Sequence, residues 1–304
     1  MERERPAIDP EVVRAWTDDI DVAPKTAEAY ARSLASFAAW AASCGRDFDA
    51  LGAEDVLDYK RFLLREKKAA PATVSLRLCA LRSFYAWSER RGLEDIARTV
   101  KGAPASRARA RDALTLAQAR GLLESLPRAG EKGLRDAALV ELMLRTGVRD
   151  VEAIRADVGD VRGRGGRRVL YVQGKGRAEK DAFVVLSPAV EAALRAYLDA
   201  RGPVPPSAPL FASVAPRNRG GRLTVRSVSR IVRGALDRAG LADPRLTAHS
   251  LRHTAVTFAL LGGADVREAQ AMARHADVST TVGYAHDLER MARAAEDRID
   301  EYLA

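Results

Sequence analysis

Apolar residues recur at spacings of three and four through most of the first hundred residues, which is the pattern of helices that bury one face. Residues 26–42 and 71–90 show it most clearly, and residues 55–68 supply a further helix. The pattern predicts a helical N-terminal domain over residues 1–103.

The periodicity gives way at residues 104–113, where Pro, Ser and alternating arginines replace the apolar positions, as is typical of a linker. Beyond this linker, residues 114–304 form the second predicted domain, with helices expected over 115–126, 134–146, 188–201, 225–239, 248–261 and 265–274. Residues 168–173 and 181–186 alternate apolar and polar positions around a Gly-rich turn, which predicts a β-hairpin. The expected fold class is mainly α with a small antiparallel sheet, in two domains.

Composition limits the class of protein. The chain has 304 residues, of which 47% are hydrophobic, so it is long enough to bury two ordinary cores. Lysine and arginine number 50 against 41 acidic residues, for a formal net charge of +9, which favours nucleic acid as a partner. A GC-rich genome would produce part of the same arginine bias.

Only two cysteines occur and no apolar run could span a bilayer, so we expect a cytoplasmic protein without membrane attachment.

Histidine is confined to one part of the chain. All four histidines lie within residues 249–286. Imidazole titrates near neutrality, so this confinement points to local proton chemistry. His249 and Arg252 fall on one face of a predicted helix. His249 and His253 have the spacing of helical zinc ligands, but the motif lacks its glutamate and a third ligand, so no metal is expected.

Other polar residues stand where side chains can meet a ligand. Arg149 follows a Gly turn, Lys175 lies between glycines at the predicted hairpin tip, and Tyr284 follows the last predicted helix. Guanidinium forks bind phosphodiester oxygens and stabilise charge in the transition state. Imidazole and ammonium groups can move protons, and a tyrosine hydroxyl can attack. The set suits phosphodiester cleavage without a metal.

These motifs resemble those of the tyrosine recombinases, the superfamily of Xer recombinases and of phage or conjugative-element integrases. The segments TGVRDVEA, GKGRAEK, HSLRHT and ARHADVSTTVGYAH occur in the family's order and at approximately its spacing. The family's pattern of Arg, Lys, His-x-x-Arg, His or Trp, and Tyr falls on Arg149, Lys175, His249, Arg252, His275 and Tyr284. The helical N-terminal region is similar to the family's SAM-like core-binding domain.

The resemblance implies a reaction. In similar enzymes the tyrosine attacks a DNA phosphate to give a 3′-phosphotyrosyl link, and the 5′-hydroxyl of a partner duplex then resolves the link through a Holliday junction. One phosphodiester replaces another, so no cofactor, ATP or small-molecule substrate is needed. The implied partners are double-stranded recombination sites, bound by a homo-tetramer or by a hetero-tetramer with a paralogue, at the nucleoid of a prokaryotic cell.

The resemblance also implies DNA and protein contacts. Related proteins clamp the duplex between their domains, which would bring the linker arginines to the DNA backbone, and exposed basic positions of the N-terminal helices would add to them. The expected DNA-binding residues are Arg107, Arg109, Arg111, Lys60, Arg77 and Arg82. Residues 287–304 carry apolar positions at helical spacing, and a C-terminal helix of this kind docks into the next protomer in similar recombinases. Folding back onto its own domain is the alternative.

The chain departs from the family pattern at two places. It reads Ala273-Arg274-His275 where Leu-Gly-His is common, and Ser250 stands where Asp is frequent. Glu152 matches the usual acidic residue three positions after the first arginine and is expected to orient the site. A DNA-binding protein without catalysis and a type IB topoisomerase are the alternative functions. The intact set of reactive residues argues against the first, and the N-terminal domain and C-terminal helix argue against the second.

Overall fold

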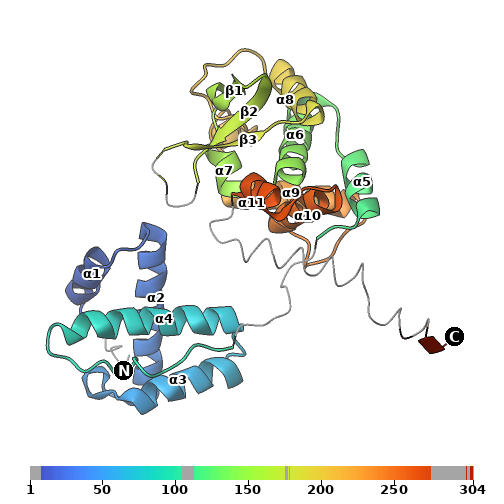
Figure 1. The fold of residues 1–304 in the computed structure, drawn as a ribbon. Helices are drawn as coiled ribbons and strands as arrows, with labels where there is room; N and C mark the ends of the chain where they lie inside the picture. Colours follow the sequence, from blue (N-terminus) through green and yellow to red (C-terminus); the bar gives the residue numbers. More distant parts are fainter. Residues whose placement is uncertain are drawn as a thin grey trace. The chain divides into compact units, whose positions relative to one another are not determined.

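The computed structural model of the chain describes residues 8–104, 113–174, 177, 179–274, 299 and 302–303. The chain divides into two compact units, Met1–Ala108 and Arg109–Ala304 (Figure 1). Each unit has a hydrophobic core of its own. Helices dominate both units, and the strands form a small antiparallel sheet. The predicted fold class is therefore confirmed.

The first unit is a helical bundle around an aromatic core. Its elements are α1 (Pro10–Asp19), α2 (Pro24–Ser43), the 3-10 helix η1 (Phe48–Ala50), α3 (Ala53–Arg65) and α4 (Pro71–Glu89). α2 packs against α1, α3 and α4. Trp16, Phe37 and Tyr59 are fully buried, and the rings of Trp16 and Phe84 meet edge to face with centroids 5.3 Å apart. Large buried rings supply much of the apolar area that stabilises a unit of this size.

The sequence pattern does not single out α1, which is short. Its start signals are nonetheless present, because Asp9 accepts a hydrogen bond from the Glu11 amide at 2.8 Å and a proline opens the first turn. Trp16 of α1 is buried in the core, and the Trp87 indole donates to Asp19 at 2.8 Å. These two contacts attach α1 to the bundle.

The second unit is built on the long helix α6. Its elements are α5 (Leu116–Glu124), α6 (Gly130–Thr146), α7 (Asp150–Arg155), η2 (Val158–Asp160), β1 (Val161–Arg164), β2 (Arg167–Val172), β3 (Ala182–Val185), α8 (Pro188–Arg201), η3 (Pro216–Asn218), α9 (Val225–Arg238), α10 (Ala248–Leu261) and α11 (Val266–Ala273). α6 is buried along most of its length and packs against α8, α9 and α10 (Figure 1). Within the described ranges, no helix combines the length and apolar content needed to cross a bilayer.

The sheet has three antiparallel strands in the described part of the chain, where the sequence predicts only a hairpin. β2 and β3 form that hairpin, with Val169 paired to Val185, and β1 lies on the other side of β2, with Val161 paired to Leu170. β1 reads Val-Arg-Gly-Arg and is mostly exposed, so it lacks the apolar alternation that marks a strand. Backbone pairing with β2, and not side-chain burial, defines it.

Candidate active site

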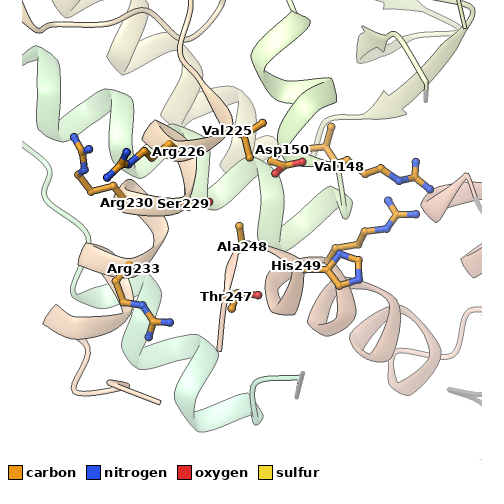
Figure 2. A pocket seen from close by; sticks show the side chains of 12 residues that line it. Val148, Asp150, Val225, Arg226, Ser229, Arg230, Arg233, Thr247, Ala248 and His249 are labelled. Atoms are coloured by element: carbon orange, nitrogen blue, oxygen red, sulfur yellow. The ribbon is translucent and has the colours of Figure 1, made fainter. Parts of the chain in front are cut away.

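A cavity of about 710 Å³ opens in the second unit where α7, α9 and α10 meet. The residue before α7 contributes Arg149, and α10 contributes His249 and Arg252. Figure 2 shows His249 on one side of the cavity and Arg226 and Arg230 of α9 on the other. The structure thus brings three of the sequence-predicted reactive residues to the lining of one cavity.

α10 presents His249 from its first turn and Arg252 from its second. The Thr247 amide donates to the Ser250 hydroxyl at 3.0 Å, and that hydroxyl donates to the Arg245 carbonyl at 3.1 Å. Ser250 therefore fixes the start of the helix, although the related motif frequently has Asp there. A spacing of three residues then places His249 and Arg252 on one helix face.

Arg252 is held by two main-chain carbonyls. Its side chain is buried, with Nη1 donating to the Gly147 carbonyl and Nη2 to the Ala273 carbonyl. Gly147 ends α6 at a φ of 61°, and a Cβ at this position would lie 3.4 Å from the Cβ of Ala255 on α10. That distance is ordinary van der Waals contact, so it is the left-handed turn that favours glycine here. The Gly turn in the sequence motif thus ends α6 at the carbonyl that accepts from Arg252.

Glu152 of α7 is not part of the cavity lining and is 1% exposed. Its Oε1 accepts from Arg149 Nη1 at 2.8 Å, and its Oε2 accepts from the Arg149 amide at 2.8 Å and from Arg274 Nη2 at 2.7 Å. Burial acts to raise the pKa of the Glu152 carboxyl, but the charge of Arg274 and the hydrogen bonds from both arginines lower it below its ordinary value. Glu152 is therefore an anion that binds both Arg149 and Arg274, and its role in orienting the site stays a prediction.

Four side chains beside the cavity form a cluster with an excess of positive charge, namely Arg149, Glu152, Arg252 and Arg274. Burial, and then the charges of Arg149 and Arg274, lower the pKa of the Arg252 guanidinium to about 9, which leaves it protonated at neutral pH. The cluster of four side chains therefore holds three guanidinium groups and one carboxylate, which accepts from Arg149 and Arg274. An incoming phosphate would relieve their mutual repulsion, so the site suits an anionic ligand.

Arg274 is a member of this cluster that the motifs do not reveal. The sequence indicates only that it replaces a glycine in the turn. In the structure Arg274 ends α11 in the left-handed conformation, with φ 54° and ψ 45°, so the turn keeps a geometry that glycine commonly provides. Its side chain extends to Glu152 and is only 12% exposed. Only the fold could show this contact, because the two residues are far apart in the sequence.

The arginines of α9 are a second feature that the sequence does not single out. Arg226, Arg230 and Arg233 recur at spacings of four and three, so they lie on one helix face, opposite the buried Val228 and Val232. All three line the cavity, and Figure 2 shows them along one of its sides. A helix with arginines on one face resembles an ordinary solvated surface until its place beside the cavity is known.

The predicted DNA-binding residues of the first unit all make hydrogen bonds within it. Lys60 donates to the Lys101 carbonyl at 2.8 Å, and Arg82 donates to the Val100 carbonyl at 2.8 Å. Arg77 donates to the hydroxyls of Ser36 at 2.8 Å and Tyr59 at 3.0 Å. These bonds attach the chain after α4 to the bundle and order polar groups beside its core. A DNA contact by these three residues stays a prediction.

The remaining predicted site residues lie outside the described residues. They are Lys175, His275, Tyr284, Arg107, Arg109 and Arg111. Near the start of β3, Lys180 donates to Asp157 at 2.6 Å and also to Asp160. Burial acts to lower the pKa of Lys180, but these two carboxylates raise it above its ordinary value. The ion pairs anchor Lys180, which follows the Gly-rich segment that contains Lys175 in the sequence.

His249 and His253 lie close together, with ring centroids 4.4 Å apart and ring planes 89° to each other. A metal site would need further ligands around such a pair. In the part of the chain that the structure describes, no group of three or more His, Cys, Asp or Glu side chains is arranged to hold a metal ion.

Comparison with known proteins decides the family. Residues 112–291 match the phage integrase family, and residues 18–95 match the N-terminal SAM-like domain of phage integrases. The first match alone covers more than half of the chain. This chain belongs to the phage integrase family of tyrosine recombinases.

Relatives of this tyrosine recombinase include Xer proteins. The chain is 35% identical over 279 residues to tyrosine recombinase XerC of Pelobacter propionicus, which covers 89% of this chain and 88% of that protein. It is 32% identical over 280 residues to tyrosine recombinase XerD of Bifidobacterium longum, which covers 87% of each. These matches include both units, so the resemblance is not limited to the catalytic motifs.

Solved recombinase structures share the fold. The XerH site-specific recombinase in a post-cleavage complex with its palindromic difH substrate matches with a TM-score of 0.72 and 20% identity, over 94% of this chain and 84% of that one. A lambda integrase dimer bound to a COC′ core site matches with a TM-score of 0.67 and 17% identity, over 89% of this chain and 96% of that one. The agreement extends over most of each chain, so these structures share the overall fold of this protein.

Proposed function

We propose that this tyrosine recombinase performs site-specific recombination of the Xer type, cutting and rejoining DNA through a 3′-phosphotyrosyl intermediate and a Holliday junction, without a cofactor or ATP. The observation that carries the proposal is the convergence of Arg149, His249 and Arg252 on one cavity, in a chain whose family and relatives are tyrosine recombinases. The relatives are named as tyrosine or site-specific recombinases, and the net charge of +9 suits DNA as the partner.

The arginines would bind the scissile phosphate. Arg252 is fixed by the Gly147 and Ala273 carbonyls, and Arg149 is fixed by Glu152 while 33% of its side chain remains exposed. Two prepositioned guanidinium groups can hold the non-bridging oxygens and stabilise the charge that builds as phosphorus becomes five-coordinate. Because the protein supplies these positions before DNA arrives, little reorganisation is needed in the transition state.

The remaining residues would move protons and form the new bond. The Tyr284 oxygen bonds to phosphorus as the bond from phosphorus to the 5′-oxygen breaks, and a histidine, which we assign to His249, accepts the tyrosine proton. Lys175 gives a proton to the departing 5′-oxygen, and His275 adds a hydrogen bond to the phosphate. The partner strand's 5′-hydroxyl reverses these steps and releases the tyrosine, so phosphodiester bonds are conserved.

A nicked suicide substrate tests the proposed function. A nick just 3′ of the cleavage site lets the short fragment that carries the new 5′-hydroxyl diffuse away. Without that hydroxyl the reaction cannot reverse, so the phosphotyrosyl link accumulates. The wild-type protein is expected to give a covalent protein–DNA adduct on its cognate site, with EDTA present. Recombinant product should then form from two intact sites. Tight DNA binding without any adduct would instead indicate an accessory DNA-binding protein, and relaxation of supercoils without recombinant product would indicate a topoisomerase.

The duplex would be held by both units. The first unit, which matches the SAM-like integrase domain, acts as the core-binding domain, and the linker arginines contact the DNA backbone. The second unit adds the arginines of α9 beside the cavity. In this proposal the protein acts on DNA in the prokaryotic cytoplasm, at the nucleoid.

Removing an arginine of α9 should weaken DNA binding and its salt dependence. Replacing Arg226 or Arg230 with Ala is expected to lower the slope of log affinity against log salt by about 0.9 for each phosphate that the variant no longer neutralises. The matched control is Arg238→Ala, which changes an exposed arginine on the same helix outside this cavity. Fluorescence anisotropy across a salt series measures the slopes. Equal slopes for all variants and the wild type would show that these α9 arginines do not contact DNA.

The proposed assembly on DNA is a tetramer, homo- or hetero-oligomeric, joined by the C-terminal helix. An apolar groove between α5, α10 and α11 suits such a helix, and its lining includes Leu116, Leu123, Phe258 and Met272. Residues 287–304 carry apolar positions at helical spacing, as an amphipathic partner for this groove requires.

Deleting the residues after Asp287 should leave Tyr284 and DNA binding in place but weaken synapsis of two sites. Loss of the apolar face of the C-terminal helix removes the surface that joins neighbouring protomers in this proposal. Native gel shifts with one and with two DNA sites separate binding from pairing, and the full chain is the control. Paired complexes at wild-type levels in the truncated protein would contradict docking between protomers.

A further inference from the structure

Arg274 has features that the proposed reaction leaves unexplained. It is not a glycine, yet its backbone is left-handed, with a φ of 54°. That conformation is disfavoured for a side chain with a Cβ. Its guanidinium is largely buried and extends from the end of α11 to α7. A strained backbone and a buried charge both need compensating contacts. The contacts of Arg274 connect it to Arg149 and Arg252 of the cavity.

The side chain of Arg274 binds the carboxylate that holds Arg149. Arg274 Nη2 lies 2.7 Å from Glu152 Oε2, and Nη1 donates to the Met272 carbonyl at 2.7 Å. The other carboxylate oxygen of Glu152 accepts from Arg149 Nη1 at 2.8 Å. A continuous chain of charged hydrogen bonds therefore runs from the end of α11 through Glu152 to Arg149.

The main chain of the same turn contacts both phosphate-binding arginines. Arg252 Nη2 donates to the Ala273 carbonyl, and Arg149 Nη2 lies 3.4 Å from the Arg274 carbonyl. The position of this turn thus sets where both guanidinium groups lie. The side chain of Arg274 ties the turn to α7 through Glu152.

We propose that Arg274 is a positioning residue for strand cleavage, which holds Glu152 and the end of α11 so that Arg149 and Arg252 are aligned to receive the scissile phosphate. This inference rests on the proposed function. Sharing Glu152 between two guanidinium groups keeps Arg149 incompletely neutralised, so the cluster retains positive charge for the phosphate. Without Arg274, Glu152 is left with Arg149 as its hydrogen-bond donor and the turn loses its tie to α7.

Arg274→Gly is the decisive variant. Glycine favours the left-handed turn, so the fold is kept while the charge and the tie to Glu152 are removed. The rate of phosphotyrosyl formation with saturating suicide substrate is expected to fall by roughly 10- to 100-fold, as for a small misplacement of reacting groups, with DNA affinity within about threefold. Arg274→Lys, which keeps the charge but not the fork, should restore part of this rate. Cleavage by Arg274→Gly at the wild-type rate would overturn the proposal.

A stability control separates alignment from folding. Lys68 is also left-handed, with a φ of 48°, and lies in the other unit. Thermal unfolding of Lys68→Gly reports the effect of placing glycine at such a position without changing the cluster. We expect neither Arg274→Gly nor Lys68→Gly to unfold below the wild-type temperature. A loss of cleavage that appears only together with a lowered unfolding temperature in Arg274→Gly would assign Arg274 to folding and overturn its positioning role.

A double-mutant cycle with Glu152→Gln tests whether Arg274 acts through Glu152. If it does, adding Arg274→Gly to Glu152→Gln lowers the cleavage rate by much less than it lowers the wild-type rate. Multiplicative losses would mean that Arg274 does not act through Glu152 and would overturn the positioning role. If the wild-type chain forms no adduct, the proposed function itself is refuted. If the wild type is active and Arg274→Gly is equally active, only the positioning role of Arg274 is refuted.

Discussion

Replacing Tyr284 with Phe is expected to abolish the covalent protein–DNA adduct while changing DNA affinity by less than about threefold. The substitution removes one hydroxyl, so no oxygen is left to bond to phosphorus, while the aromatic ring is kept. Loss of an essential nucleophile lowers catalysis by on the order of 10⁶-fold in a well-studied hydrolase, which is far below detection in an adduct assay. Denaturing gels of wild type and variant on the same nicked duplex measure the effect.

A control variant makes this result specific to one tyrosine. Tyr171 lies on β2, where its hydroxyl is 3.3 Å from Arg164 Nη1 and its ring packs near Phe183. Tyr171→Phe should give the adduct at close to the wild-type rate. Adduct formation by Tyr284→Phe, or its loss in Tyr171→Phe alone, would show that the nucleophile has been assigned to the wrong residue.

Replacing Arg252 with Lys is expected to slow strand cleavage by roughly 10²- to 10³-fold, which corresponds to about 2.7–4 kcal/mol of lost transition-state stabilisation. The guanidinium of Arg252 donates to two carbonyls, those of Gly147 and Ala273, and in the proposed mechanism it also holds a phosphate oxygen. An ammonium keeps the charge but has no planar fork, so it cannot serve these partners in the same geometry. Single-turnover cleavage on the suicide substrate measures the rate, and a gel shift measures DNA binding.

Arg128 provides the matched control for this change. Its guanidinium donates to Glu141 at 3.0 Å in an ion pair away from the cavity lining. Arg128→Lys removes a fork without touching the cluster, so the cleavage rate should stay within about twofold of wild type. If Arg252→Lys cleaved as fast as Arg128→Lys, the buried arginine would not be part of the reacting site.

The sequence pattern predicts the long helices because apolar periodicity and capping signals agree within them. The expected helix over 71–90 corresponds to α4 (Pro71–Glu89), whose proline opens the first turn, and the expected helix over 188–201 coincides with α8. The pattern does not reveal α1 or β1. α1 has few core-facing residues, and β1 is defined by pairing with β2, which local sequence does not encode.

Local motifs predict only those residues of the candidate site that lie close together in the sequence. Arg149 follows a Gly turn and Arg252 shares a helix face with His249, so short-range spacing is enough to group them with their neighbours. The contact between Arg274 and Glu152 joins residues 122 positions apart, and no local pattern indicates it. The α9 arginines do not stand out either, because their spacing also fits a solvated helix face. What the fold adds is the tertiary approach of α7, α9 and α11 to the start of α10.

Peptide mapping of the trapped adduct tests the central claim most directly. The covalent complex formed by the wild-type protein on a nicked site is digested with protease and nuclease, and the modified peptide is identified by tandem mass spectrometry. We expect a nucleotide attached through a 3′-phosphate to the peptide that contains Tyr284, with Tyr284 as the modified residue. A nucleotide on any other side chain, or a 5′-phosphate linkage at Tyr284, would contradict the proposed chemistry.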